Sequence, residues 1–445
     1  MHSACAGWAR VASLLFLGLS ACSSQPSPAD LPEKSGKQIS ETQNPKASAS
    51  EATPPQAASP QGKVLLAHYM PWYETPSGRG RWGSHWTGHE KQHDPAKLKE
   101  NGLPDIWSHY HPLIGPYDSA DPDALECHLL QMKLAGIDGV VADWYGPVAF
   151  HDYEPIHQAS QALFAACEKF GMKFVTCFED RTIEVMVKDG GLKAEEVPGH
   201  LRKVIDWCKS EWFSKSHYFK LEGKPLLTNF GPIYVQEKES WQQALGNGSE
   251  RPLLYCLPHL RDKAGADGGY SWVHFEAWQG NPDSATLRQR LTEIYNRISA
   301  NPQQTIVSAL PGFDDIYAKS YGHIDFRNGD TLRDSLAVCM EGPWSVVQLV
   351  TWNDYGEGTM FEPTHEQGYL ALEIVQEARR KEGGGKFPFS AEDLRLPARL
   401  YALRKTPAMD SVALDKISQL LNAGKCGEAK QALDALQPVD AKGAN

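Results

Sequence analysis

Eight short apolar segments between residues 64 and 352 constrain the fold of this chain more than any other feature. They occupy residues 64–69, 139–144, 173–178, 225–230, 252–257, 272–277, 305–310 and 346–352. Near-continuous apolar runs of this length are typical of strands buried on both faces of a parallel sheet. Most follow helical patterns, such as 122–135 and 284–298. We therefore predict an α/β fold, a (β/α)8 barrel of the TIM type, over residues 63–390.

The segment between the fifth and sixth predicted strands fits this pattern poorly. Residues 258–271 contain three glycines and no helical periodicity. An open, doubly wound parallel sheet is therefore the structural alternative. After the barrel, two helical patterns on either side of Gly424 predict a small C-terminal helical hairpin within residues 391–445.

The N-terminus has the features of a secretory signal. An apolar run over 11–19 follows Arg10 and is too short to span a bilayer. The tetrapeptide Leu-Ser-Ala-Cys at 19–22 resembles the bacterial lipobox, in which the cysteine is lipidated and becomes the new N-terminus. We predict a lipoprotein signal peptide over residues 1–21 and lipidation at Cys22.

Residues 23–62 contain eight serines and seven prolines in forty positions, and no aromatic residue. Such a composition cannot bury a core and is typical of a flexible linker. We therefore predict that residues 22–62 tether the barrel to a membrane through the N-terminal lipid. The expected location is the bacterial cell envelope, at the outer membrane.

The composition excludes several partners and favours one. Forty-four Lys and Arg residues against 55 Asp and Glu residues give a net charge of −11, which is unsuited to nucleic-acid binding. No Cys-x-x-Cys pair, metal-type histidine spacing or Gly-rich phosphate loop is present, so the sequence indicates no cofactor, although Asp314 and Asp315 could hold a metal ion. Aromatic residues make up 10% of the chain, with 13 Trp, which suits stacking on a polysaccharide or oligosaccharide.

Polar side chains stand at or just after the C-terminal ends of nearly all the predicted strands. They are His68 and Tyr69, Asp143 and Trp144, Glu179 and Asp180, Asn229, Glu276, Asp314 and Asp315, and Asp354 and Glu357. In a barrel all of these strand ends meet at one rim, where barrel enzymes have their active sites. The recurrence predicts an active site at this rim.

The segment 348–364 (QLVTWNDYGEGTMFEPT) has the pattern of a catalytic loop. Asp354 and Glu357 lie three positions apart among glycines, directly after an apolar strand. Two neighbouring carboxyl groups acquire different pKa values, so that one ionises while the other keeps its proton. Cleavage of a glycosidic bond needs this division between a base or nucleophile and a general acid.

This segment resembles glycoside hydrolase family 99, the endo-α-mannosidases, and family 71, the α-1,3-glucanases. Family 99 carries Trp/Phe-Asn-Glu-Trp-His-Glu-Gly-Thr-x-x-Glu-Pro, and family 71 carries Trp-Asn-Asp-Tyr-Gly-Glu, which matches 352–357 throughout. HYMPWY at 68–73, residues 115–147 and GKPLLTNF at 223–230 are also similar to family 99. The resemblance covers residues 63–380.

The resemblance implies that Asp354 takes the place of the first catalytic carboxylate and Glu357 that of the general acid, with Tyr69 and Trp144 lining sugar subsites. Family 99 has Glu at the position of Asp354, so this carboxylate is retracted by about 1.5 Å. The other predicted substrate-binding residues come from the aromatic loop 69–86, the strand ends and the motif: Trp72, His85, Glu179, Glu276, Asp314, Arg327, Trp352 and Asn353.

We therefore expect a lipid-anchored glycoside hydrolase that cleaves α-linked glycans of the mannan or glucan type, and an endo-acting enzyme because the rim is open to a polymer. One alternative is a non-catalytic glycan-binding lipoprotein on the same scaffold. A more distant alternative is a lyase or a transglycosylase.

Overall fold

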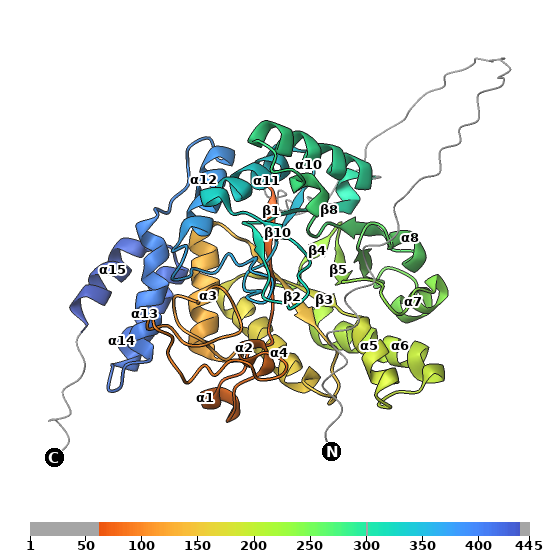
Figure 1. Cartoon of the computed structure of the whole chain (residues 1–445), viewed down its shortest axis with the longest axis horizontal. Helices are drawn as coiled ribbons and strands as arrows, with labels where there is room; N and C mark the ends of the chain where they lie inside the picture. The colour runs from red at the N-terminus through yellow and green to blue at the C-terminus, as the bar shows by residue number, and fades with distance from the viewer. Residues whose placement is uncertain (1–61, 300, 437–445) are drawn as a thin grey trace, which may run out of the picture. The chain divides into compact units, whose positions relative to one another are not determined.

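A closed barrel of eight parallel strands forms the centre of the computed structural model, which describes residues 62–299 and 301–436 (Figure 1). The barrel strands are β1 (Val64–Tyr69), β2 (Gly139–Trp144), β3 (Lys173–Phe178), β5 (Lys224–Asn229), β6 (Leu253–Cys256), β7 (Gly268–Tyr270), β8 (Thr305–Ala309) and β11 (Val346–Leu349). Pairing of β1 with β11 and of β3 with β5 closes the ring. The predicted (β/α)8 barrel is confirmed, and the open-sheet alternative is wrong because no barrel strand lies at an edge.

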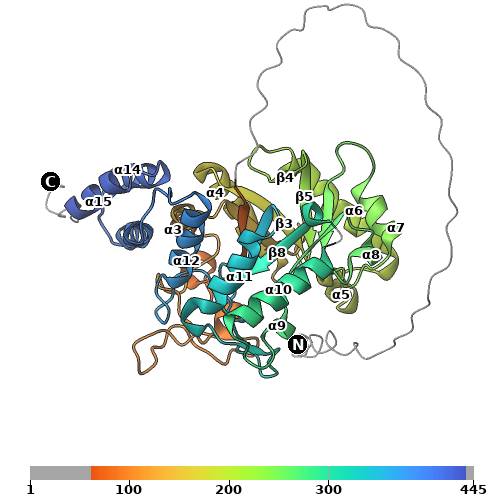
Figure 2. The same ribbon diagram turned by 90° about the horizontal axis from the view of Figure 1, so that it is seen from above.

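Helices surround the strands on the outside of the barrel (Figures 1 and 2). The longer ones are α3 (Pro122–Ala135), α4 (Tyr153–Phe170), α5 (Arg181–Lys188), α6 (Val197–Cys208), α7 (Lys238–Leu245), α10 (Ser284–Ile298), α11 (Asp330–Glu341) and α12 (Leu370–Glu382). Single turns and short strand pairs fill the connections: α1 (Pro76–Arg79), α2 (Ser84–Thr87), α8 (Arg261–Ala264), α9 (Phe275–Trp278), β4 (Lys220–Leu221), β9 (Phe313–Asp314) and β10 (His323–Ile324). Helix α3 starts where Asp121 accepts a hydrogen bond from the backbone N–H of Asp123, and it ends at the left-handed Gly136.

The sixth strand lies earlier in the chain than the sequence predicts. The apolar segment 272–277 forms a loop and the first turns of α9, whereas β7 is the Gly268-Gly269-Tyr270 segment. A Cβ atom at Gly268 would stand 2.4 Å from both the carbonyl oxygen of Gln304 and the ring of Tyr255. Close packing requires glycine at this position. Because glycine is not counted as an apolar residue, the pattern of apolar runs does not predict β7.

Two separate hydrophobic clusters reflect the alternation of side chains along the strands. One fills the barrel interior and includes Val141 and Cys177. The other lies between the strands and the helices and includes Tyr69, Trp144 and Phe178. Successive residues of a strand point to opposite faces, so neighbours at a strand end have different environments.

Three helices follow the barrel, namely α13 (Leu396–Arg404), α14 (Ser411–Asn422) and α15 (Cys426–Ala435). They confirm the predicted C-terminal helical segment. Glu126 of α3 joins them to the barrel, since its carboxylate accepts hydrogen bonds from Arg404 and from Ser418 Oγ, the latter at 2.6 Å. This glutamate is 4% exposed, and a buried carboxylate needs such partners.

No helix in the described part of the chain is both long and apolar enough to cross a membrane. The predicted signal peptide, Cys22 and nearly all of the predicted linker lie outside the described residues. The seven cysteines in the described part of the chain are all buried and form no disulfide bonds.

Candidate active site

The loop after β11 holds Asp354 and Glu357 in one tight turn. The backbone N–H of Asp354 donates to Thr351 Oγ1 at 2.7 Å, and the N–H of Glu357 donates to Asp354 Oδ1 at 2.9 Å. The N–H of Gly358 donates to the carbonyl of Asp354 at 3.0 Å. The turn therefore fixes the Asp354 carboxyl group relative to the backbone of Glu357.

A second loop, which follows β8, supports this turn from the side. The N–H of Asp314 donates to the carbonyl of Glu357 at 2.9 Å, and the N–H of Ile316 donates to the carbonyl of Gly356 at 3.0 Å. Gly358 has φ +67°, and a Cβ atom there would stand 2.5 Å from the carbonyl oxygen of Asp314. Only glycine allows both the turn and this close approach.

The environments of the two carboxyl groups differ. Burial raises the pKa of Asp354 to about 6, although backbone N–H groups of Glu357 and Gly356 favour its ionised form. Burial and the charges of Asp354, Asp315 and Glu179 raise the pKa of Glu357 well above its usual value. Glu357 Oε2 is buried and has no hydrogen-bond partner among the described residues. Backbone donors favour the ionised form of Asp354 alone, so the two groups differ in how readily they ionise.

Two further carboxyl groups lie close enough to interact with this pair. Burial, together with the charges of Asp180 and Asp354, raises the pKa of Glu179 to about 7, against the opposing effect of Arg181. Burial, followed by the charges of Glu179 and Asp354, raises the pKa of Asp143 well above its usual value. Residues from β2, from the end of β3 and from the loop after β11 therefore converge at the C-terminal rim of the barrel.

Asn353 and Trp352 hold the loop after β11 in place instead of facing the rim. Asn353 Oδ1 accepts from the N–H of Met70 at 2.8 Å, and its Nδ2 donates to the Met70 carbonyl and to Tyr117 Oη, both at 3.0 Å. Both side chains are fully buried. The prediction that they bind substrate is therefore corrected to a supporting role.

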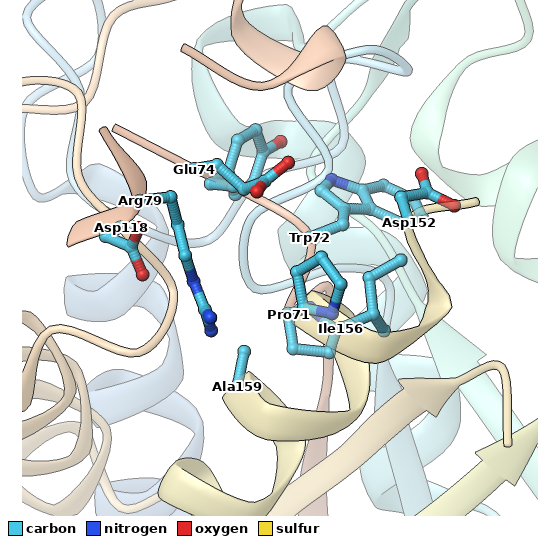
Figure 3. A pocket seen from close by; sticks show the side chains of 10 residues that line it. Pro71, Trp72, Glu74, Arg79, Asp118, Asp152, Ile156 and Ala159 are labelled. Carbon is cyan, nitrogen blue, oxygen red and sulfur yellow. The ribbon is translucent and has the colours of Figure 1, made fainter. Parts of the chain in front are cut away.

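Trp72 and His85 remain candidates for sugar contact. Their rings stack with centroids 4.3 Å apart and an interplanar angle of 6°, and both side chains are partly exposed. Trp72 lines a pocket together with Glu74, Arg79 and Asp152 (Figure 3). These residues come from the loops after β1 and β2, so the pocket is at the same rim as Asp354.

Tyr69 and Trp144 point into the layer between strands and helices, so the prediction that they line sugar subsites is wrong. Tyr69 is 0% exposed, and its Oη lies 3.0 Å from His128 Nδ1. Trp144 is 0% exposed, and its Nε1 donates to His157 at 3.1 Å. Neither ring has a free face for a sugar.

Glu276 and Arg327 also lie outside the site. Glu276 is exposed on α9, near His274 and Arg297 at 3.4 and 3.7 Å. Arg327 forms a 2.6 Å ion pair with Asp334 of α11. Both predictions of substrate binding are corrected because these partners hold the side chains elsewhere.

Both carboxylate oxygens of Asp314 and one of Asp315 have polar neighbours, and neither residue belongs to a group of possible metal ligands in the described part of the chain. Asp314 Oδ2 accepts from Tyr110 at 3.0 Å, and its Oδ1 lies 3.3 Å from His323 Nδ1. Asp315 Oδ2 accepts from the N–H of Tyr321 at 2.7 Å. Asp314 therefore contributes to the site mainly through its backbone contact with Glu357.

Two residues near the pair were given no role of their own from the sequence: Asp143, which was noted only as a strand-end residue, and Tyr317. Asp143 is next to Trp144 but points into the barrel, which period-two alternation along β2 could have shown. Tyr317 lies beside the catalytic turn, since a Cβ atom at Gly356 would stand 2.8 Å from its Oη. Burial and the charges of Asp354 and Glu357 raise its pKa far above the usual value. Tyr317 comes from an irregular loop, where the sequence offers no periodic signal.

Comparison with protein families gives a match to glycosyl hydrolase family 99 over residues 60–255. The mouse glycoprotein endo-α-1,2-mannosidase is 34% identical over an alignment of 333 residues that covers 68% of this chain and 68% of that protein. The mouse glycoprotein endo-α-1,2-mannosidase-like protein is 24% identical over 327 residues, covering 67% of this chain and 69% of that protein.

A solved structure of similar fold is the family 99 endo-α-mannosidase from Bacteroides thetaiotaomicron. It superposes with a TM-score of 0.54 at 20% identity, covering 72% of this chain and 98% of that one. This likeness supports the barrel fold.

Proposed function

Because the chain belongs to glycosyl hydrolase family 99 and is a glycoside hydrolase, we propose that it cleaves α-mannosidic bonds within an oligosaccharide or polysaccharide. Asp354 acts as the base and Glu357 as the general acid. Trp72, His85 and Glu179 contact the sugar residues. The family relatives named as endo-α-1,2-mannosidases make α-1,2-linked mannosides the first substrates to test.

The observation that carries this assignment is the unequal environment of two carboxyl groups in one turn. Asp354 receives a backbone N–H at 2.9 Å, which stabilises its negative charge. Glu357 Oε2 is buried without a partner among the described residues and faces several other acids, which favours retention of its proton. The pair thus supplies the proton donor and the proton acceptor that glycosidic cleavage requires.

The experiment that tests the substrate is a panel of defined glycans. The full chain should release oligosaccharides from α-1,2-linked mannan and leave α-1,3-glucan intact, as followed by mass spectrometry of the products. Release of internal fragments supports endo action, whereas release of single sugars from chain ends would contradict it. Cleavage of the glucan alone would overturn the assignment to mannosides.

The pair also predicts a bell-shaped dependence of kcat/KM on pH. Asp354 must be ionised to act as a base, so activity should fall as the pH drops through its pKa of about 6. Glu357 must be protonated, so activity should fall again as the pH rises through its raised pKa. The charges of Asp354, Asp315 and Glu179 add to the effect of burial on the pKa of Glu357. Activity that increases steadily toward acid pH would contradict this assignment of roles.

We further propose that a lipid on Cys22 anchors the enzyme in a bacterial cell envelope, at the outer membrane, with residues 22–62 as a tether. The lipobox-like tetrapeptide at 19–22 and the composition of the linker support this.

Cys22→Ser should therefore yield a folded, active enzyme that no longer sediments with membranes, because lipid anchoring needs the thiol. Fractionation of cells that express each form measures this. Equal amounts of wild type and variant in the membrane fraction would refute lipid anchoring.

A further inference from the structure

Three side chains with metal-binding chemistry meet inside the barrel below the candidate active site. His68 of β1, Asp143 of β2 and Cys177 of β3 place their ligand atoms within 4.8 Å of one another. Asp143 and Cys177 are direct partners in the sheet, and His68 is paired with Val141 on the same strand as Asp143. Their exposures are 1%, 1% and 0%, so the group is enclosed by protein.

The hydrogen bonding of this cluster is incomplete. Both oxygens of Asp143 are buried and have no partner among the described residues. His68 Nδ1 makes only a long contact, 3.4 Å, with Gln348 Oε1, whereas Cys177 Sγ is hydrogen-bonded to Tyr270 Oη at 3.6 Å. Burying a carboxyl group without hydrogen bonds lowers the stability of the fold. A bound ligand that contacts Asp143 would remove this penalty.

We propose that His68, Asp143 and Cys177 form a binding site for one divalent transition-metal ion, best matched by Zn²⁺. Imidazole nitrogen, carboxylate oxygen and thiolate sulfur are the three donor types that zinc sites use. Donor atoms around tetrahedral zinc stand about 3.3–3.8 Å apart, so the ligand atoms of these side chains must approach one another by up to about 1.5 Å. The fourth position would be filled by water, as in open zinc sites.

The charges around the cluster favour a cation. Asp143 interacts with the carboxyl groups of Glu179 and Asp354, and Arg181 is the cation that acts on Glu179. A dication would offset the negative charge that the buried carboxylates accumulate. The proposal concerns these residues alone and does not depend on the choice of sugar.

The test is titration of the full-length chain, stripped of metal with a chelator, with Co²⁺ and then Zn²⁺. We expect one equivalent of Co²⁺ to produce a thiolate-to-cobalt charge-transfer band, which Zn²⁺ abolishes by displacement. Cys177→Ser should remove the band, and Asp143→Asn should weaken metal affinity by more than about 100-fold, because loss of even an outer partner of a ligand costs 10–100-fold. Cys167→Ser, a buried thiol on α4, is the matched control and should retain the band.

Three outcomes would overturn the proposal: no stoichiometric binding by the wild type, a thiolate band that persists in Cys177→Ser, or equal affinity in wild type and Asp143→Asn. Circular dichroism of each metal-free variant establishes that it is folded. If Cys177→Ser does not fold, Asp143→Asn, which preserves side-chain shape, decides the question. None of these readouts uses glycan cleavage, so failure here is distinct from failure of the proposed function.

Discussion

Replacing Glu357 with Gln, or Asp354 with Asn, should lower kcat by about 10²–10⁴-fold while the fold and much of the substrate affinity persist. Each change preserves side-chain shape and removes one proton-transfer role. The two variants should differ with an activated substrate. A good leaving group needs no protonation, so it should partly rescue Glu357→Gln but not Asp354→Asn. Steady-state kinetics on a natural glycan and on an aryl glycoside measure both effects.

Glu366→Gln is the matched control for this experiment. Glu366 lies on the same connecting segment, but its carboxylate accepts from the N–H of His111 at 2.9 Å and is held there by the His111 ring. Turnover of this variant should equal that of the wild type. Wild-type turnover in Glu357→Gln or Asp354→Asn would show that the pair does not perform the chemistry.

Trp144→Ala should destabilise the protein by about 3–5 kcal/mol, because it removes a large, fully buried ring from the layer between strands and helices. The ring lies among Phe178, Trp207 and Trp212, with centroid distances of 5.0–6.1 Å. Urea unfolding of wild type and variant gives the change in the free energy of unfolding.

Trp72→Ala provides the contrast for this prediction. Its ring is partly exposed at the rim. The substitution should therefore raise KM for the glycan and leave the free energy of unfolding nearly unchanged. A stability loss below about 1 kcal/mol for Trp144→Ala would contradict the buried position of that ring.

The sequence predicts the barrel well because most of its strands coincide with apolar runs. Seven of the eight segments overlap the observed strands, and the helix over 284–298 agrees with α10 at both ends. The sixth strand is missed because the packing around Gly268 demands a residue without a side chain. The hydrophobicity of the sequence does not show that Gly268 packs closely against Gln304 and Tyr255.

The candidate site is predicted less completely, and strand alternation explains why. At the ends of β1 and β2 the sequence analysis selects Tyr69 and Trp144, which point outward, while His68 and Asp143 point into the barrel. Glu276 and Arg327 are misassigned because the sequence does not show which nearby charged residue each of them pairs with, namely Arg297 and Asp334. Asp354 and Glu357 could be selected because one short loop carries both.

The central claim is that water cleaves a glycosidic bond through Asp354 and Glu357, and cleavage of α-1,2-linked mannan in H₂¹⁸O tests it most directly. A hydrolase incorporates one ¹⁸O atom for each bond that it breaks, and this label appears in the cleavage products. We predict such labelled fragments from the wild type and almost none from the variant that combines Asp354→Asn with Glu357→Gln. Unlabelled, unsaturated fragments would indicate a lyase, and unchanged mannan would indicate a protein that only binds glycans; either result would contradict the account.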